Sequence, residues 1–196
     1  LMREVCFPLF MSRTPYPCWG LSLQEPIEDT DGFISTFLSW RENENWLLLG
    51  APAAVSETQL WTAWLGLNSR HTNGTMRANS IDVEFLRLIA GTHQIKIGFH
   101  RAGLQNGDQE LWLIHIPECN NEAIIEMQWP DLDRIGLDRE ANRLMCALNA
   151  KLIPRVPMPH EKSVDRLELE VEDRNASDFN SIERAALAHI ALADLN

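Results

Sequence analysis

The residues with the clearest chemical potential form a short basic stretch within a strongly acidic chain. Between residues 70 and 101, four arginines and one lysine stand against Asp82 and Glu84, a local net charge of +3 in a chain of net charge −11. Three of the six histidines lie in the same window. Guanidinium, ammonium and imidazole groups gathered in this way bind phosphate and other oxyanions. The stretch therefore predicts a polyanionic partner, the alternative being a core segment whose charges are only solvated.

A second group of residues has the chemistry of a metal site or an acid–base pair. His115 and Glu118 are three residues apart after an apolar run, and His93 precedes a segment with helical spacing. Together they would suit a small metal-dependent hydrolase. The sequence has no phosphate-binding loop, dinucleotide fingerprint, nucleophile elbow or zinc-protease motif. Because six histidines and 28 acidic residues make chance pairs of this kind common, we favour a protein that is not an enzyme.

Two short helices must position the basic stretch. The apolar residues of the first helix recur on one side of a 3.6-residue period: Ile81, Phe85, Leu88 and Ile89. Asn79 or Ser80 is expected to cap its start. Gly91 follows the last apolar residue, where a left-handed backbone conformation is common.

The second helix is predicted to begin directly after that glycine. We expect Thr92 to cap it and Gly103 to end it. Ile95 and Phe99 are four residues apart, so they are expected to form its buried face. The basic side chains would then surround the turn between the two helices.

The remaining elements intermix without regular alternation. The sequence predicts strands near residues 20–24, 46–49, 111–116 and 167–171, and helices near 30–40, 56–73, 138–149 and from 181 onward. Residues 123–127 are expected to form a strand or a helix. This pattern predicts an α/β (α+β) fold with a single mixed, mainly antiparallel sheet and helices packed on it. We expect residues 1–19 to be an N-terminal extension and residues 20–196 a single domain.

Composition narrows the class of protein further. No apolar run reaches the roughly 18–20 residues that a membrane helix needs, and the apolar start is a poor signal peptide, so we expect a cytoplasmic protein. The cysteines are not arranged as metal-binding or redox pairs: Cys6, Cys18, Cys119 and Cys146. The strongly negative total charge disfavours broad, non-specific nucleic-acid binding, so any RNA contact should be local.

The stretch ANSIDVEFLRLIAGTHQIKIGFHRAGL resembles the signature of the kinase-binding subunits of the KEOPS complex, the archaeal and eukaryotic relatives of the PRPK-binding protein. The matching positions are Ser80, Glu84, Leu86, Gly91, Thr92, Gln94, Ile95, Gly103 and Leu104. The terminal segment SIERAALAHIALADLN is similar to the last helix of that family, with Glu183, Arg184, Ala186, Leu187, Asp194 and Leu195 in matching places. The resemblance covers roughly residues 20–116 and 181–196.

The resemblance implies a non-catalytic, regulatory subunit of the machinery that makes threonylcarbamoyladenosine in tRNA, without a cofactor or metal of its own. Such a subunit binds the atypical KEOPS kinase/ATPase and recruits tRNA through its 3′ CCA end. A single-stranded end is held by cations and planar groups. The candidate tRNA-binding residues are Arg77, Arg87, Thr92, His93, Gln94, Lys96 and Arg101. The candidate kinase-binding residues are Ile182, Arg184, Ala186, Leu187, Ile190 and Leu195.

One departure from the family pattern keeps an alternative open. His93 stands where the family usually has arginine, and histidine is mostly neutral at pH 7. A protein–protein adaptor that regulates the kinase without touching RNA would also fit this change and the acidic total charge.

Overall fold

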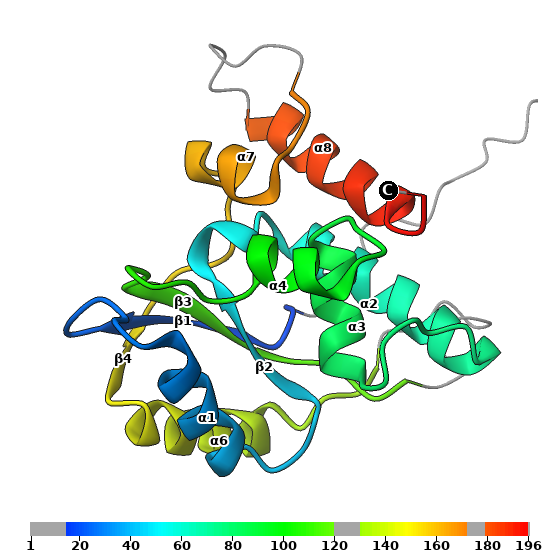
Figure 1. The fold of residues 1–196 in the computed structure, drawn as a ribbon. Helices are drawn as coiled ribbons and strands as arrows, with labels where there is room; N and C mark the ends of the chain where they lie inside the picture. The colour runs from blue at the N-terminus through cyan, green and yellow to red at the C-terminus, as the bar shows by residue number, and fades with distance from the viewer. Residues whose placement is uncertain (1–14, 120–129, 172–178, 196) are drawn as a thin grey trace, which may run out of the picture.

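A computed structural model describes residues 15–119, 130–171 and 179–195 (Figure 1). Its centre is a four-stranded sheet in the order β2-β3-β1-β4, in which every pair of neighbouring strands is antiparallel. The strands are β1 (Cys18–Leu23), β2 (Trp46–Gly50), β3 (Glu110–His115) and β4 (Ala150–Ile153). The predicted fold class, a sheet of mainly antiparallel strands with helices packed on it, is confirmed.

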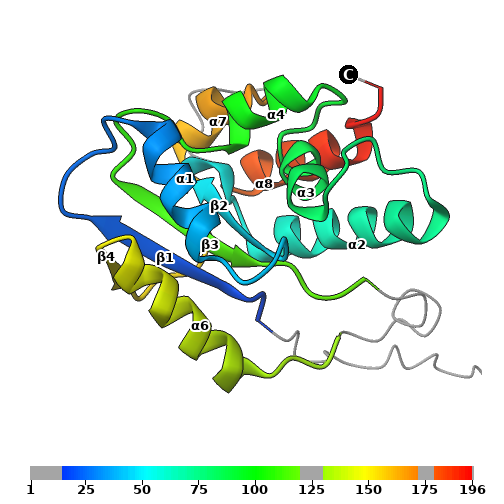
Figure 2. The same ribbon diagram turned by 60° about the horizontal axis from the view of Figure 1, so that its bottom comes forward.

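Helices cover both faces of the sheet, as Figures 1 and 2 show together. One face carries α1 (Thr30–Trp40) and α6 (Arg134–Ala147). The other carries α2 (Glu57–Asn73), α3 (Ile81–Ile89), α4 (Ile95–Ala102), α7 (Glu161–Leu167) and α8 (Phe179–Leu192), with the short 3-10 turn η1 (Ala51–Ala53) after β2. Within the described residues, no helix combines the length and apolarity that crossing a bilayer requires.

Strand alternation divides the apolar interior into two cores. Successive side chains of a strand point to opposite faces of the sheet. Trp46 and Leu48 of β2 therefore join the core beneath α1 and α6, whereas Leu47 and Leu49 join the core beneath α2, α3 and α8. All five residues of β2 are buried, because both faces of the sheet are covered. Tryptophans contribute to both cores, with Trp19 and Trp46 in the first and Trp61, Trp64 and Trp112 in the second.

Local sequence signals explain several of the elements. Ser56 caps α2, because its hydroxyl accepts a hydrogen bond from Gln59 N at 3.0 Å. The predicted α1 is confirmed from Thr30 to Trp40, although Asp29 rather than Thr30 provides the cap. Gly74 ends α2 in a left-handed conformation, with φ of 65°.

The structure differs from the sequence prediction most clearly at the N-terminal boundary and after α7. The folded part begins before residue 20: Tyr16 is buried against Trp61, with ring centroids 4.7 Å apart, and β1 starts at Cys18. The strand expected at 167–171 is wrong, because Leu167 is the last residue of α7 and Glu168 adopts a left-handed conformation that ends the helix. The predictions for residues 1–14 and 123–127 fall outside the described residues.

Candidate nucleic-acid interface

The turn between α3 and α4, residues 90–95, lies at the centre of the predicted tRNA site. Gly91 adopts the expected left-handed conformation, with φ of 62°. Thr92 is nearly buried and its hydroxyl accepts a hydrogen bond from Gln94 N at 3.1 Å. The prediction that Thr92 caps α4 is wrong, because Gln94 is the residue that precedes the first helical turn. Thr92 instead lies inside the turn and stabilises it through this hydrogen bond.

Gly91 also allows the end of α8 to approach this turn. A Cβ atom added at Gly91 would lie 2.6 Å from Cβ of His189. Glycine is therefore required here both for its backbone conformation and for the absence of a side chain. Burial, and then the nearby Arg101, lower the pKa of His189 below its ordinary value.

The polar side chains after the glycine are open to solvent. His93, Gln94 and Lys96 are all exposed, on one short segment at the start of α4. Arg77, from the loop before α3, has a side chain that is 49% exposed. These four of the seven predicted residues are therefore accessible to a partner.

Arg87 occupies a very different environment, because its side chain is fully buried. Glu84, one turn earlier in α3, forms an ion pair with Arg87 Nη2 and accepts a 3.2 Å hydrogen bond from Arg87 Nε. Arg87 Nη1 donates to the carbonyl oxygens of Thr92 at 2.9 Å and Ala193 at 3.1 Å. Burial lowers the pKa of Arg87, but its contacts with Glu84 and Asp194 together outweigh burial and hold that pKa above its ordinary value. Arg87 therefore fixes the turn and the end of α8, and it does not present a cation at the surface.

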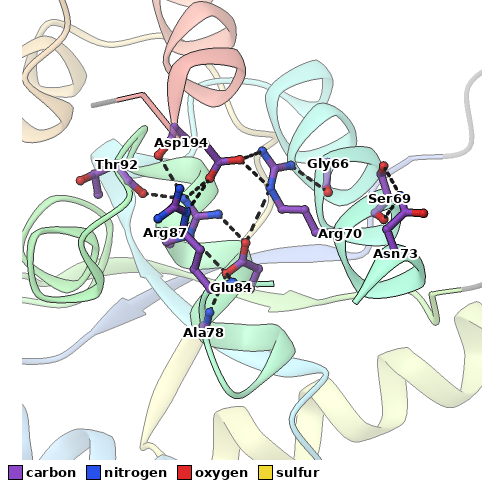
Figure 3. A network of polar contacts seen from close by, with 11 residues as sticks. Gly66, Ser69, Arg70, Asn73, Ala78, Glu84, Arg87, Thr92 and Asp194 are labelled. Atoms are coloured by element: carbon purple, nitrogen blue, oxygen red, sulfur yellow. Dashed lines mark hydrogen bonds and ion pairs between the residues drawn. The ribbon is translucent and has the colours of Figure 1, made fainter. Parts of the chain in front are cut away.

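Asp194, just after α8, joins two further arginines to this cluster (Figure 3). Arg70 of α2 donates to Asp194 Oδ2 from Nη2 at 2.7 Å and from Nε at 3.2 Å. Arg77 Nε lies 3.3 Å, and Arg87 Nη1 3.0 Å, from Asp194 Oδ1. Burial raises the pKa of Asp194, but the arginines outweigh it and hold that pKa below its ordinary value. We call Arg70, Arg77, Glu84, Arg87 and Asp194 the Asp194 network.

Glu84 connects the network to the loop that carries Arg77. Its Oε2 accepts hydrogen bonds from the backbone N–H groups of Arg77 at 3.1 Å and Ala78 at 3.0 Å. A fully buried carboxylate is stable only with such partners. The loop before α3, the α3–α4 turn and the end of α8 are therefore held by one set of contacts.

Arg101, the last of the predicted cations, is mostly covered. It forms an ion pair with Glu168 and donates to Ala90 O at 3.3 Å, and its side chain is 16% exposed. The structure thus separates the predicted tRNA-binding set. Three members are covered and hold the turn in place or lie beside it: Arg87, Thr92 and Arg101. The other four are accessible at the surface: Arg77, His93, Gln94 and Lys96.

The buried face predicted for α4 is wrong. Ile95 and Phe99 are 37% and 46% exposed, and Gly98 and Ala102 are the buried residues of that helix. Gly98 lets α4 pack closely on α3, since a Cβ atom there would lie 3.3 Å from Cα of Arg87. Phe99 borders an apolar hollow of about 70 Å³ between α1, α3 and α4.

The predicted kinase-binding residues also divide between core and surface. Ile182, Ala186 and Ile190 are buried as one stripe of α8, which packs against α2, α3 and α7. Arg184 is exposed, and so is Leu195, at 79%. Leu187 is half-buried. The surface of α8 that a partner can contact is therefore narrower than the predicted set.

The residues of the alternative metal site do not form a ligand group. Among residues 15–119, 130–171 and 179–195, no group of three or more histidine, cysteine, aspartate or glutamate side chains is arranged to hold a metal ion. His115 packs edge-on against Trp46, with ring centroids 4.8 Å apart, and burial lowers its pKa to about 4.

A larger hollow was not predicted from the sequence. It has a volume of about 970 Å³ and lies between η1, α7 and the turn before β3. Arg155 stacks over Trp112 in its wall, 5.0 Å from the ring centroid, and ion pairs with Glu110 at 2.6 Å. Its lining comes from segments between residues 51 and 179, so no local motif marks it.

Comparison with models of known protein families and with curated proteins yields no match for this chain.

Proposed function

We propose that this protein is a non-catalytic subunit of a KEOPS-type machinery, which recruits tRNA through its 3′ CCA end and binds the atypical kinase/ATPase of the complex. The resemblance of residues 76–104 to the kinase-binding subunits supplies the identity of the partners. The geometry of the 90–95 turn and its surroundings supports the RNA contact.

One observation carries this proposal: exposed polar groups project from a backbone that is held rigidly from below. His93, Gln94 and Lys96 lie at the surface, while the fully buried Arg87 fixes the Thr92 carbonyl beneath them. A single-stranded RNA end offers phosphates and unstacked bases, which cations and planar amide or imidazole groups can hold. Rigid support reduces the conformational entropy lost on binding.

The test is a titration of the purified protein with intact tRNA and with the same tRNA lacking its three terminal nucleotides. Because each stacked base contributes on the order of 1–3 kcal/mol, removal of the end should weaken binding about tenfold or more. Both titrations are run with and without the kinase subunit and at two salt concentrations. Equal binding of the two tRNAs would contradict the proposal.

The second candidate is an adaptor that binds the kinase and has no RNA contact. The exposed apolar residues Ile95 and Phe99 on α4 and Leu38 on α1 favour it, because such residues at a surface are typical of protein-binding sites. This adaptor would retain the kinase in a pull-down but show no difference between tRNA and a tRNA-free control. Substitution of Phe99 by serine would then reduce kinase retention, with Ile135→Ser, at a 67% exposed position on α6, as the matched control.

A further inference from the structure

Three arginine side chains from different elements converge on the Asp194 carboxylate, and Figure 3 labels two of them, Arg70 and Arg87. Arg70 approaches from α2, Arg77 from the loop before α3, and Arg87 from α3. Three guanidinium groups around one small acidic group form the arrangement that proteins use for oxyanions with several oxygens.

A carboxylate satisfies this arrangement incompletely. Arg87 Nη1 carries two hydrogens but has three oxygens within 3.1 Å, those of Thr92, Ala193 and Asp194 Oδ1. Asp194 Oδ1 is buried and, among the described residues, accepts no well-aligned hydrogen bond. A planar group with two oxygens thus fills a site whose donors come from three directions. A tetrahedral group with more oxygens would meet them better.

The net charge of the Asp194 network and its exposure to solvent also favour a tetrahedral anion such as phosphate. The three arginines carry +3, and Glu84 and Asp194 carry −2, so the network has a net charge of +1. A phosphate group carries up to two negative charges at neutral pH. The site is open on one side, because the Arg77 and Asp194 side chains are 49% and 38% exposed.

Asp194 can leave without unfolding of α8. It lies beyond the last residue of that helix, Leu192. The helix is anchored separately by the buried side chains of Ile182, Ala186 and Ile190. Ala193, directly before Asp194, is itself buried, and its carbonyl oxygen accepts a hydrogen bond from Arg87 Nη1, so rotation of the Asp194 side chain alone is the movement that opens the site.

We propose that Arg70, Arg77 and Arg87 form a binding site for a phosphate group, and that Asp194 fills this site until phosphate displaces it. The inference does not rest on the proposed function, since inorganic phosphate is the probe. Only the fraction of molecules in which Asp194 has left the site can bind phosphate. The apparent affinity for phosphate is therefore reduced by that fraction.

The first experiment follows the arginine Nε–H signals of the wild-type protein by NMR during a titration with inorganic phosphate at constant ionic strength. The signals of Arg70 and Arg77 should shift with a saturable dependence on phosphate, and chloride alone should not shift them. Arg166, which pairs with Asp108 at 2.9 Å elsewhere in the fold, is the internal control. Equal shifts at Arg166 would overturn the inference.

The second experiment measures phosphate affinity by calorimetry for the wild type and for Asp194→Asn, which has nearly the same shape without the charge. Asp194→Asn should bind phosphate about tenfold more tightly or better. The double variant Asp194→Asn/Arg77→Gln should lose that gain. Equal affinities of the wild type and Asp194→Asn would overturn the inference, and so would the absence of binding to either protein. If Asp194→Asn does not fold, the NMR titration of the wild type still decides.

A parallel titration with a dinucleoside monophosphate separates the two sources of such a group. Binding of this probe at the same arginines would support a phosphodiester of a nucleic-acid strand as the occupant. Binding of inorganic phosphate alone would support the free ion. Because neither probe contains a tRNA end, failure of the proposed tRNA recruitment would leave both results interpretable.

Discussion

Arg87 and Lys96 are nine residues apart in the same basic stretch, yet they occupy opposite environments. Arg87 is fully buried and bound on several sides by Glu84, backbone carbonyls and Asp194. Lys96 lies at the surface on the first turn of α4. Both residues count equally toward the local charge of +3. The comparison teaches that a basic stretch in a sequence combines cations that hold the fold with cations that can meet a partner.

The largest expected effect comes from replacing the buried arginine, Arg87. Arg87→Met leaves Glu84 as an uncompensated buried carboxylate, so we expect a loss of about 3–5 kcal/mol in the free energy of unfolding. Chemical denaturation measures it. The matched control is Arg143→Met, which removes an exposed arginine–glutamate pair with the same three-residue spacing and should change stability little. Comparable losses in the two variants would contradict the structural role of Arg87.

The next effect tests the contact between the 90–95 turn and α8. Gly91→Ala forces a side chain into a left-handed conformation and against His189, so we expect a loss of about 2–4 kcal/mol. Gly74→Ala is the control, because φ is 65° there and nothing lies within 4 Å of the added Cβ atom. It should cost only about 1 kcal/mol. Thermal unfolding that fails to distinguish the two variants would show that α8 does not press on the turn.

A smaller effect is expected on the exposed side. Lys96→Ala should leave stability within about 0.5 kcal/mol of the wild type. Its affinity for tRNA should fall about three- to fivefold, and the slope of log affinity against log salt should decrease by about 1. Lys151→Ala, an exposed lysine on β4, is the matched control. An equal effect of the two substitutions would contradict the proposed RNA contact at Lys96.

The smallest expected effect is a dependence of stability on pH, and it arises from His189, where α8 meets the turn at Gly91. The pKa of His189 is lowered in the folded protein, so the unfolded chain binds its proton more readily. The stability of the wild type should therefore decrease as pH falls below about 6.5, the ordinary histidine value. In His189→Gln this contribution should disappear. Parallel denaturation curves from pH 7.5 to 5.5 measure the difference between the two proteins, and identical slopes would contradict it.

Periodic segments with local caps were predictable from the sequence. The apolar spacing of α3 depends on residues within two helical turns and is confirmed, and the hydrogen bond by which Ser56 caps α2 joins residues equally close together. The three buried residues of α6 and the buried Leu148 directly after it follow from the same spacing: Ala141, Leu144, Met145 and Leu148. Such signals are local, so a single sequence contains them.

The errors come from contacts that no local pattern contains. The spacing of Ile95 and Phe99 is helical, but Gly98 decides which face of α4 packs, because only a residue without a side chain lets α3 approach so closely. The burial of Arg87 depends on Asp194, more than 100 residues later in the chain. The alternation of Leu167 and Leu169 imitates a strand, but both residues are buried around the left-handed end of α7. Tertiary packing overrides the period in each case.

The separation of the interior into two cores has an optical consequence. Trp19 and Trp46 lie on one side of the sheet, and Trp61, Trp64 and Trp112 lie on the other. The chain therefore carries fluorescent reporters in each layer. Replacing the core tryptophans of one layer with phenylalanine would remove the contribution of that layer to the emission, and comparison with the wild type would then show the order in which the two layers loosen.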